Sequence, residues 1–188
     1  MQNTQKSTKV AFGGLVAALS LVLLALTGLF PMGTLALPAL SGVLLLSVMI
    51  EISPSWAGIT YGVVAVLSFF ITADQQAWAL FTLFFGYYPA LKFTLEKKRR
   101  RAVVWGLKYL VFNAALALYI VVCLFFFQLD LSSMPGILSS QNVLLWAAPL
   151  MFLLCNAVFF VYDRALSGLA FLYWRRLHPV VQRLTRGK

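Results

Sequence analysis

The sequence predicts an all-α membrane protein, a bundle of six transmembrane helices whose N- and C-termini are both cytoplasmic. Its composition is the first observation behind this prediction. The 188 residues are 62% hydrophobic and only 11% charged, with a mean hydropathy of +0.90, whereas a soluble domain is nearer half apolar and a quarter charged. The second observation is that basic residues lie at the ends of long apolar runs. Lipid is therefore the expected solvent for most of the chain.

Six apolar segments are long enough to be spans, because about 20 helical residues cross the hydrocarbon of a bilayer. They cover approximately residues 11–30, 35–51, 56–73, 77–95, 102–129 and 142–174, and the last is expected to extend beyond the bilayer. The first run is longer than the apolar core of a signal peptide, about 7–15 residues, and is expected to be retained. Residues 1–188 are thus expected to form one transmembrane domain with no soluble domain.

The charges predict the orientation. With six spans, all 15 Lys and Arg residues fall on the side of the N-terminus, and only Asp74 and Asp130 fall on the other side. Because basic loops stay in the cytoplasm, we expect a multi-pass protein of a bacterial plasma membrane with residues 175–188 as a basic cytoplasmic tail. The net charge of +10 does not indicate nucleic-acid binding, since the basic residues share no soluble face.

Residues 85–101 join an aromatic apolar run to the densest positive charge in the chain. In the six-span arrangement this stretch is the inner end of the fourth span and the central cytoplasmic loop. Pro89 lacks an N–H group and crowds the preceding turn, so the fourth span is expected to be bent or interrupted there. The stretch is expected to anchor the protein at the membrane surface rather than to bind a ligand.

The sequence carries no signature of an enzyme. Its single His, His178, lies in the basic tail, and it has no Gly-rich phosphate loop or nucleophile–base pair. Cys123 and Cys155 lie inside apolar runs and are expected to be ordinary buried residues. Glu51, with no second carboxylate near it, is expected to cap a helix or pair with the basic loop. We therefore predict no catalytic residue, no metal site and no cofactor.

Polar residues inside the spans are expected to face the bundle, because buried charge is costly in lipid. Asn113 and Asn156 are mid-span amides that can bond each other or a ligand. Lys92 and Lys108 lie toward the inner surface and can extend their ammonium groups to it. Asp163 is expected to pair with one of the basic groups.

A second polar set gathers at the outer ends of the spans. Aromatic rings there can stack on a ligand, and amides and acids can orient it, although each residue is equally compatible with a solvated loop end. The tentative substrate-binding residues are Thr34, Asp74, Gln75, Trp78, Phe81, Gln128, Asp130, Asn142 and Trp146.

The first span carries a stripe of small residues, Gly13, Gly14, Ala17 and Ala18. The spacing gives two overlapping small-xxx-small pairs, which let another helix approach closely in lipid. The other helix can belong to this chain's own bundle or to a separate membrane partner, and the four residues are tentative docking residues for such a partner.

In length, six spans, short loops and this stripe, the chain resembles the substrate-binding S components of energy-coupling factor (ECF) vitamin transporters. The resemblance implies that the stripe packs on a transmembrane coupling subunit, and that paired ATPases drive substrate release. It also implies that a vitamin-like molecule binds in the outer half, among the fourth to sixth spans and the loop between the first two. The chain departs from the family in that loop, residues 30–37, which is short and apolar.

An alternative from another class fits the same six spans. A bacterial membrane scaffold of the rod-shape-determining type binds partner proteins rather than a solute, and a small lipid-binding accessory protein is a third possibility. The polar residues of the last three spans favour a ligand site, whereas the apolar first three spans fit either function.

Overall fold

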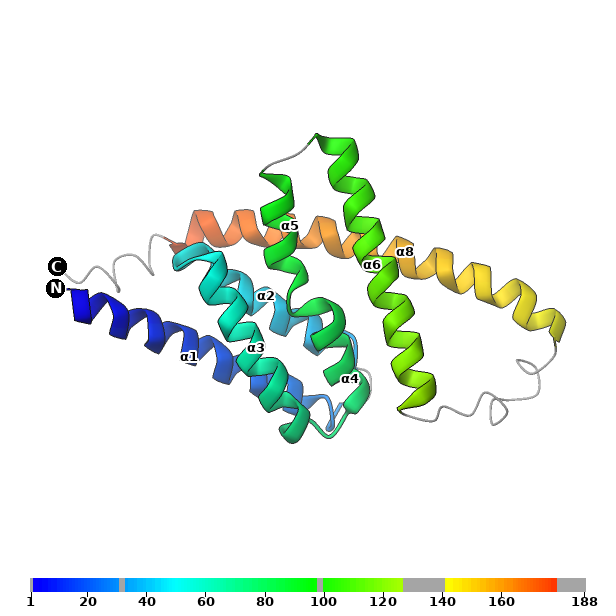
Figure 1. Ribbon diagram of the computed structural model, residues 1–188, viewed down its shortest axis with the longest axis horizontal. Coiled ribbons are helices and arrows are strands. Elements are labelled where there is room, and N and C mark those ends of the chain that lie inside the picture. The colour runs from blue at the N-terminus through cyan, green and yellow to red at the C-terminus, as the bar shows by residue number, and fades with distance from the viewer. Residues whose placement is uncertain (1, 31–32, 98–99, 127–140, 179–188) are drawn as a thin grey trace.

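A computed structural model gives the fold of the chain (Figure 1). It describes residues 2–30, 33–97, 100–126 and 141–178, without the side chains of residues 2–6, 141–146 and 177. Within these ranges all regular structure is helical and there is no strand. The elements are α1 (Gln2–Leu26), α2 (Ala36–Glu51), α3 (Pro54–Ile71), α4 (Gln75–Leu80), the π-helix η2 (Phe81–Phe85), α5 (Tyr88–Glu96), α6 (Arg101–Phe125), α8 (Gln141–Leu172) and the π-helix η4 (Tyr173–Leu177).

The first three helices pack together around an aliphatic core. Leu24 of α1, Val48 of α2 and Val64 of α3 are fully buried in it. The turn between α2 and α3 follows directly from its sequence. The Ser53 hydroxyl accepts a hydrogen bond from the Trp56 N–H at 3.4 Å, and Pro54 occupies the first turn, where no intrahelical N–H bond is lost.

The predicted fourth span is divided into α4, η2 and α5. The π-helix ends at Phe85, and α5 begins at Tyr88 with Pro89 in its first turn. A proline there sacrifices no hydrogen bond and has the backbone angle of a helix start. The predicted interruption near Pro89 is therefore confirmed, and the break itself falls at Gly86 and Tyr87.

α2 lies at the centre and contacts α1, α3 and the three pieces of the fourth predicted span. Gly42 of α2 packs directly on the end of η2, and a Cβ atom at this position would overlap the backbone oxygen of Phe85. Only a residue without a side chain allows this contact, so Gly42 sets how closely α2 packs on η2.

An aromatic core joins η2 and α5 to α6 and α8. Phe84, Tyr88 and Phe159 are buried in it, and the rings of Phe112 and Phe159 are stacked with their centroids 4.5 Å apart. Next to this core the mid-span amides bond each other. Asn113 Nδ2 donates to Asn156 Oδ1 at 3.2 Å, and Asn156 Nδ2 donates to Asn113 Oδ1 at 3.3 Å. The first of the two predicted roles for this pair is confirmed.

Among the described residues, four helical segments are long and apolar enough to cross a membrane: Ser7–Leu26, Pro54–Ile71, Arg101–Phe125 and Ala147–Arg176. α2 is shorter, with 16 residues, and the fourth predicted span is broken. In α8 the consecutive residues from Leu150 to Leu154 are all exposed, by 54% to 67%. Since five consecutive residues surround a helix, α8 is apolar on every side here. The fold is compatible with a multi-pass membrane protein.

The helix ends gather on two sides of the molecule (Figure 1). The start of α1, the turn between α2 and α3, the end of α5, the start of α6 and the end of η4 lie to the left and top. The end of α1, the turn between α3 and α4 and the end of α6 lie at the bottom, with the start of α8 at the lower right. The molecule therefore has two distinct ends.

Several helix bounds differ from the predicted ones. α1 begins at Gln2 and ends at Leu26, because polar residues continue a helix as readily as apolar ones and the Thr27 hydroxyl bonds to the Leu24 carbonyl at 2.7 Å. α6 ends at Phe125. Arg175 and Arg176, predicted in the tail, lie in η4. Residues 127–140, residues 179–188 and residues 31–32 of the loop between the first two spans lie outside the described residues.

Gly42→Ala is expected to lower the free energy of unfolding by about 1–3 kcal/mol, because its methyl group would overlap the Phe85 carbonyl. The measurement is the thermal unfolding midpoint of the detergent-purified protein. Gly106→Ala is the matched control, since nothing lies within 4 Å of a Cβ atom at that position in α6. Equal midpoints for the two variants would contradict the close contact between α2 and η2.

Candidate functional site

The predicted outer site contains a carboxylate whose hydrogen-bond donors come from the chain itself. Thr34 Oγ1 donates to Asp74 Oδ2 at 2.7 Å. The other carboxylate oxygen, Oδ1, accepts the backbone N–H groups of Gln76 and Ala77 at 3.0 and 3.2 Å. Asp74 is thus the N-cap of α4, and it ties the start of that helix to the segment before α2.

Two neighbouring members of the predicted site bond to the end of α3. Gln75 Nε2 donates to the carbonyls of Phe69 and Thr72 at 3.4 and 3.3 Å. Trp78 Nε1 donates to the Ala65 carbonyl at 2.9 Å, and its ring centroid lies 4.9 Å from that of Phe69. These contacts fix the angle between α3 and α4. They give the polar groups of Gln75 and Trp78 hydrogen-bond partners without a ligand.

The remaining members of the predicted set fall into two groups. Phe81 is fully buried in the aliphatic core, with its ring 6.0 Å from Tyr61. The other four lie outside the described side chains: Gln128, Asp130, Asn142 and Trp146. The structure therefore brings Thr34, Asp74, Gln75 and Trp78 to one end of the molecule, and their contact with a ligand stays a prediction.

The small-residue stripe of α1 is divided between two faces. Gly13 is buried, with the position of its missing Cβ 3.4 Å from Thr60 Oγ1, and Ala17 packs against the aliphatic core. Gly14 and Ala18 are exposed, and nothing lies within 4 Å of a Cβ atom at Gly14. Half of the stripe is therefore used inside this chain and half is open.

An apolar cavity of about 270 Å³ lies between η2, α6 and α8. Among its described lining residues, only the tyrosines carry hydroxyl groups, and the Tyr162 hydroxyl is buried without a hydrogen-bond partner in the same part of the chain. Sequence reasoning named none of its lining residues as ligand contacts, because apolar side chains at helical spacing are typical of any core. Its lining includes Leu35, Phe84, Ala115, Tyr119, Cys155 and Tyr162.

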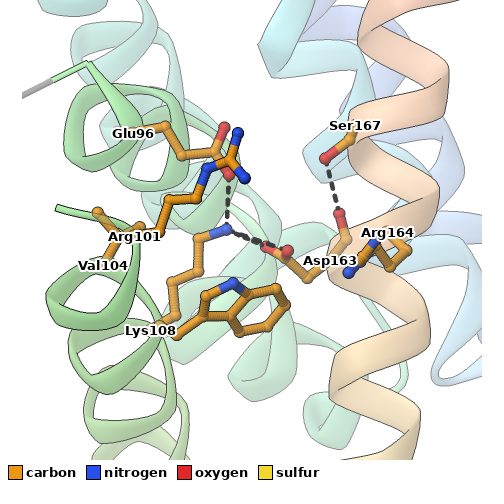
Figure 2. A pocket seen from close by; sticks show the side chains of 8 residues that line it. Glu96, Arg101, Val104, Lys108, Asp163, Arg164 and Ser167 are labelled. Carbon is orange, nitrogen blue, oxygen red and sulfur yellow. Dashed lines mark hydrogen bonds and ion pairs between the residues drawn. The ribbon is translucent and has the colours of Figure 1, made fainter. Parts of the chain in front are cut away.

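A buried cluster of charges forms where α5, α6 and α8 meet (Figure 2). Asp163 Oδ1 lies 2.9 Å from Lys92 Nζ and 3.0 Å from Lys108 Nζ, and it accepts a 2.6 Å hydrogen bond from the Tyr88 hydroxyl. Lys92 also donates to the Asp163 carbonyl and, at 2.7 Å, to the Ser167 hydroxyl. Asp163 therefore holds three helices together, and its predicted pairing with a basic group is confirmed.

The lysines of this cluster do not reach the surface. Lys92 is 0% exposed and Lys108 is 2% exposed, so the expected extension of both toward the membrane surface is wrong. Lys108 Nζ instead bridges Asp163 to Glu96 Oε1, 2.6 Å away, whose side chain is 38% exposed. Ionic bonds to two carboxylates hold the ammonium groups inside, where a lone lysine would be costly. Two ammonium groups thus balance two carboxylates.

A pocket of about 420 Å³ opens beside this cluster (Figure 2). Arg101 and Lys108 line it from α6, and Arg164 lines it from α8. The Trp105 ring lies between the two helices, with Lys108 Nζ 4.9 Å and Arg164 Cζ 5.8 Å from its centroid. The sequence placed Arg101 at the end of the basic loop, and only the packing of α6 on α8 assembles the pocket.

Glu51 contacts the other end of the chain. Its Oε1 accepts a 3.0 Å hydrogen bond from the Tyr173 hydroxyl and lies 3.0 Å from His178 Nδ1. Glu51 is the last residue of α2, and these contacts with η4 and His178 are not a helix cap. Residues 98 and 99 of the basic loop lie outside the described residues, so pairing of Glu51 with that loop stays a prediction. Its role is to join α2 to η4, a contact between residues too far apart in sequence for a local pattern to indicate.

Comparison of the chain with protein families, curated proteins and solved structures finds no match. Function is therefore inferred from the apolar cavity, the charged pocket and the open half of the α1 stripe.

Asp163→Asn is expected to lower the free energy of unfolding by about 3–5 kcal/mol, because two buried ammonium groups would lose their shared counter-charge. Lys108→Met should cost less, since Lys92 and Asp163 remain paired. Unfolding of the purified protein in detergent measures both changes. Arg164→Gln, at the next and exposed position, is the control and should stay within about 1 kcal/mol of wild type. An Asp163→Asn variant as stable as this control would show that the cluster does not hold the helices.

Proposed function

We propose that this chain is the membrane-embedded, substrate-binding subunit of an ECF-type ABC importer, and that it captures a vitamin-like or other small micronutrient from outside. In this proposal the chain crosses a bacterial plasma membrane six times with both termini in the cytoplasm. It binds and presents its substrate without changing it chemically. A coupling subunit in the membrane and paired ATPases supply the energy for import.

The apolar cavity is the observation that carries the proposal. It lies between η2, α6 and α8 and is partly open, since its lining residues Met151 and Leu154 are 60% and 56% exposed; Leu35, just before α2, also lines it. Leu35 lies at the end of the molecule where Asp74 begins α4, the end that the positive-inside rule assigns to the outside. At about 270 Å³ the cavity is slightly below the usual range for small-molecule sites, about 300–1,000 Å³. Its size suits a ligand of one or two rings.

The lining of the cavity suggests the character of the ligand. Phe84 and Ala115 offer apolar contacts, and Tyr119 and Cys155 add weakly polar groups. Since almost no polar surface faces the cavity, its lining suits a largely apolar, uncharged molecule.

Six crossings are compatible with α2, which is short, and with the fourth predicted span, which is broken. The 16 residues of α2 rise about 24 Å, and α1, α3 and the pieces of the fourth span surround the helix. A helix shielded from lipid need not match the bilayer thickness by itself. The broken fourth span is tolerated for the same reason, because non-helical backbone at membrane depth is acceptable where protein covers it.

The open half of the α1 stripe is the proposed contact with the coupling subunit. Gly14 and Ala18 leave a flat strip on an exposed face of α1, against which another helix can pack closely. Gly13 and Ala17 are already covered by this chain. The docking surface is therefore narrower than the four residues that the sequence suggested.

The cavity is tested by filling it. Ala115→Phe should reduce ligand affinity at least about tenfold, or 1.4 kcal/mol, because residue 115 is buried and lines the cavity. Ala114→Phe is the matched control, since it makes the same change at the next position, which is exposed. Mass spectrometry of the detergent-purified proteins should detect a co-purified small molecule with wild type and Ala114→Phe, and not with Ala115→Phe.

Two results would count against solute binding. One is a wild-type protein that carries no small molecule and shows no thermal shift with any member of a vitamin panel. The other is a ligand retained equally by both variants. The first result would favour the scaffold alternative, in which the chain binds partner proteins.

Docking is tested separately. Gly14→Leu or Ala18→Leu should abolish co-purification with an ECF coupling subunit while leaving the isolated chain folded, because the added side chains fill the strip without meeting this chain. Gly106→Leu, on an open face of α6, should leave co-purification unchanged. Co-purification that survives both α1 substitutions would exclude this face as the docking site.

A further inference from the structure

The pocket beside the ion cluster carries positive charge that the cluster does not neutralise. Lys92 and Lys108 are balanced by Asp163 and Glu96. Arg101 and Arg164 line the same region, and neither forms an ion pair with a carboxylate in the described part of the chain.

These two arginines approach the pocket from different helices. Arg101 begins α6 and Arg164 lies on α8, with the Lys108 side chain extending from α6 to Asp163 between them (Figure 2). Both arginines are exposed, so their guanidinium groups can reach an anion in the pocket. Guanidinium groups bind phosphate oxygens through several N–H donors at once.

Exposed apolar side chains lie beside the pocket, where α6 and α8 meet. Phe160, one turn before Arg164 on α8, is 41% exposed, and Arg164 Cζ lies 5.2 Å from the centroid of its ring; Val161, the next residue, is 66% exposed. The Trp105 ring lies between these helices, stacked on Phe160 with centroids 5.6 Å apart. A tryptophan beside positive charge is typical of the boundary between lipid and water. An occupant of this pocket would therefore meet charge at one end and hydrocarbon-facing surface beside it.

We propose that this pocket binds the phosphate headgroup of an anionic phospholipid, with its acyl chains lying along the exposed apolar faces of α6 and α8. The charge requires an anion, and the apolar flanks favour an anion that carries hydrocarbon over free phosphate. Basic pockets between transmembrane helices bind such headgroups for this reason. The pocket lies at the start of α6, and lipid binding there does not depend on solute binding in the apolar cavity.

Native mass spectrometry of the full chain in neutral detergent tests the proposal, with phosphatidylglycerol, phosphatidylcholine and inorganic phosphate as probes. One phosphatidylglycerol should stay bound at concentrations where phosphatidylcholine does not, and millimolar phosphate should not displace it. The double variant R101Q/R164Q should bind phosphatidylglycerol about 30-fold more weakly. R175Q/R176Q, which removes two charges from η4 outside the pocket, should change binding less than about threefold.

Circular dichroism and size-exclusion profiles establish that each variant is folded. If the double variant does not fold, R101Q alone should weaken binding about fivefold. Equal losses in R101Q/R164Q and R175Q/R176Q would overturn the proposal by showing general charge attraction. Displacement of the lipid by phosphate would overturn it in favour of a soluble anion, and equal retention of phosphatidylcholine would exclude recognition of the headgroup charge.

Discussion

The buried carboxylate of Asp163 is the contact on which the position of α8 depends. α8 touches the other helices at few points, and apolar side chains cover most of its surface. Asp163 binds Lys92 and Tyr88 of α5 and Lys108 of α6. Charge-assisted hydrogen bonds have a defined direction, which apolar contacts lack, so they fix the position of α8 relative to both helices. Stacked rings such as Phe112 and Phe159 complete the joint. Both the apolar cavity and the charged pocket use α8 as a wall, so the geometry of each follows from this cluster.

The break in the fourth predicted span lets its pieces serve different regions. η2 lines the cavity, and α5 supplies Tyr88, Lys92 and Glu96 to the ion cluster. Gly42 permits α2 to press against the carbonyl at the end of η2. The π-helix and the following turn therefore sit between a tightly packed central helix and a cavity. Such single-turn π-helices are frequent at functional sites.

The cavity and the charged pocket are adjacent on α8 and still chemically separate. Tyr162 lines the cavity, and Asp163, the next residue, belongs to the cluster. Consecutive residues of a helix point about 100° apart, so neighbouring positions can serve an apolar and an ionic environment. The ionic groups are balanced among themselves, which keeps their field local and leaves the cavity apolar. One helix thereby separates a candidate solute site from a candidate lipid site.

The helical class and the interruption near Pro89 could be predicted from the sequence, because hydrophobic runs and proline act over a few residues. The sequence also anticipated the amide pair Asn113–Asn156 and a basic partner for Asp163, since a polar group in an apolar span must find a complementary one. Which basic residues pair with Asp163 depends on how the helices pack, because Lys92 and Asp163 are 71 residues apart in sequence. The packing of the helices also buries Lys92 and Lys108 and gives the Asp74 carboxylate its hydrogen-bond donors. It joins Glu51 to η4 and leaves Gly14 and Ala18 of the α1 stripe exposed. The apolar cavity had no local signal, since a lining residue and a core residue differ only in what lies opposite them.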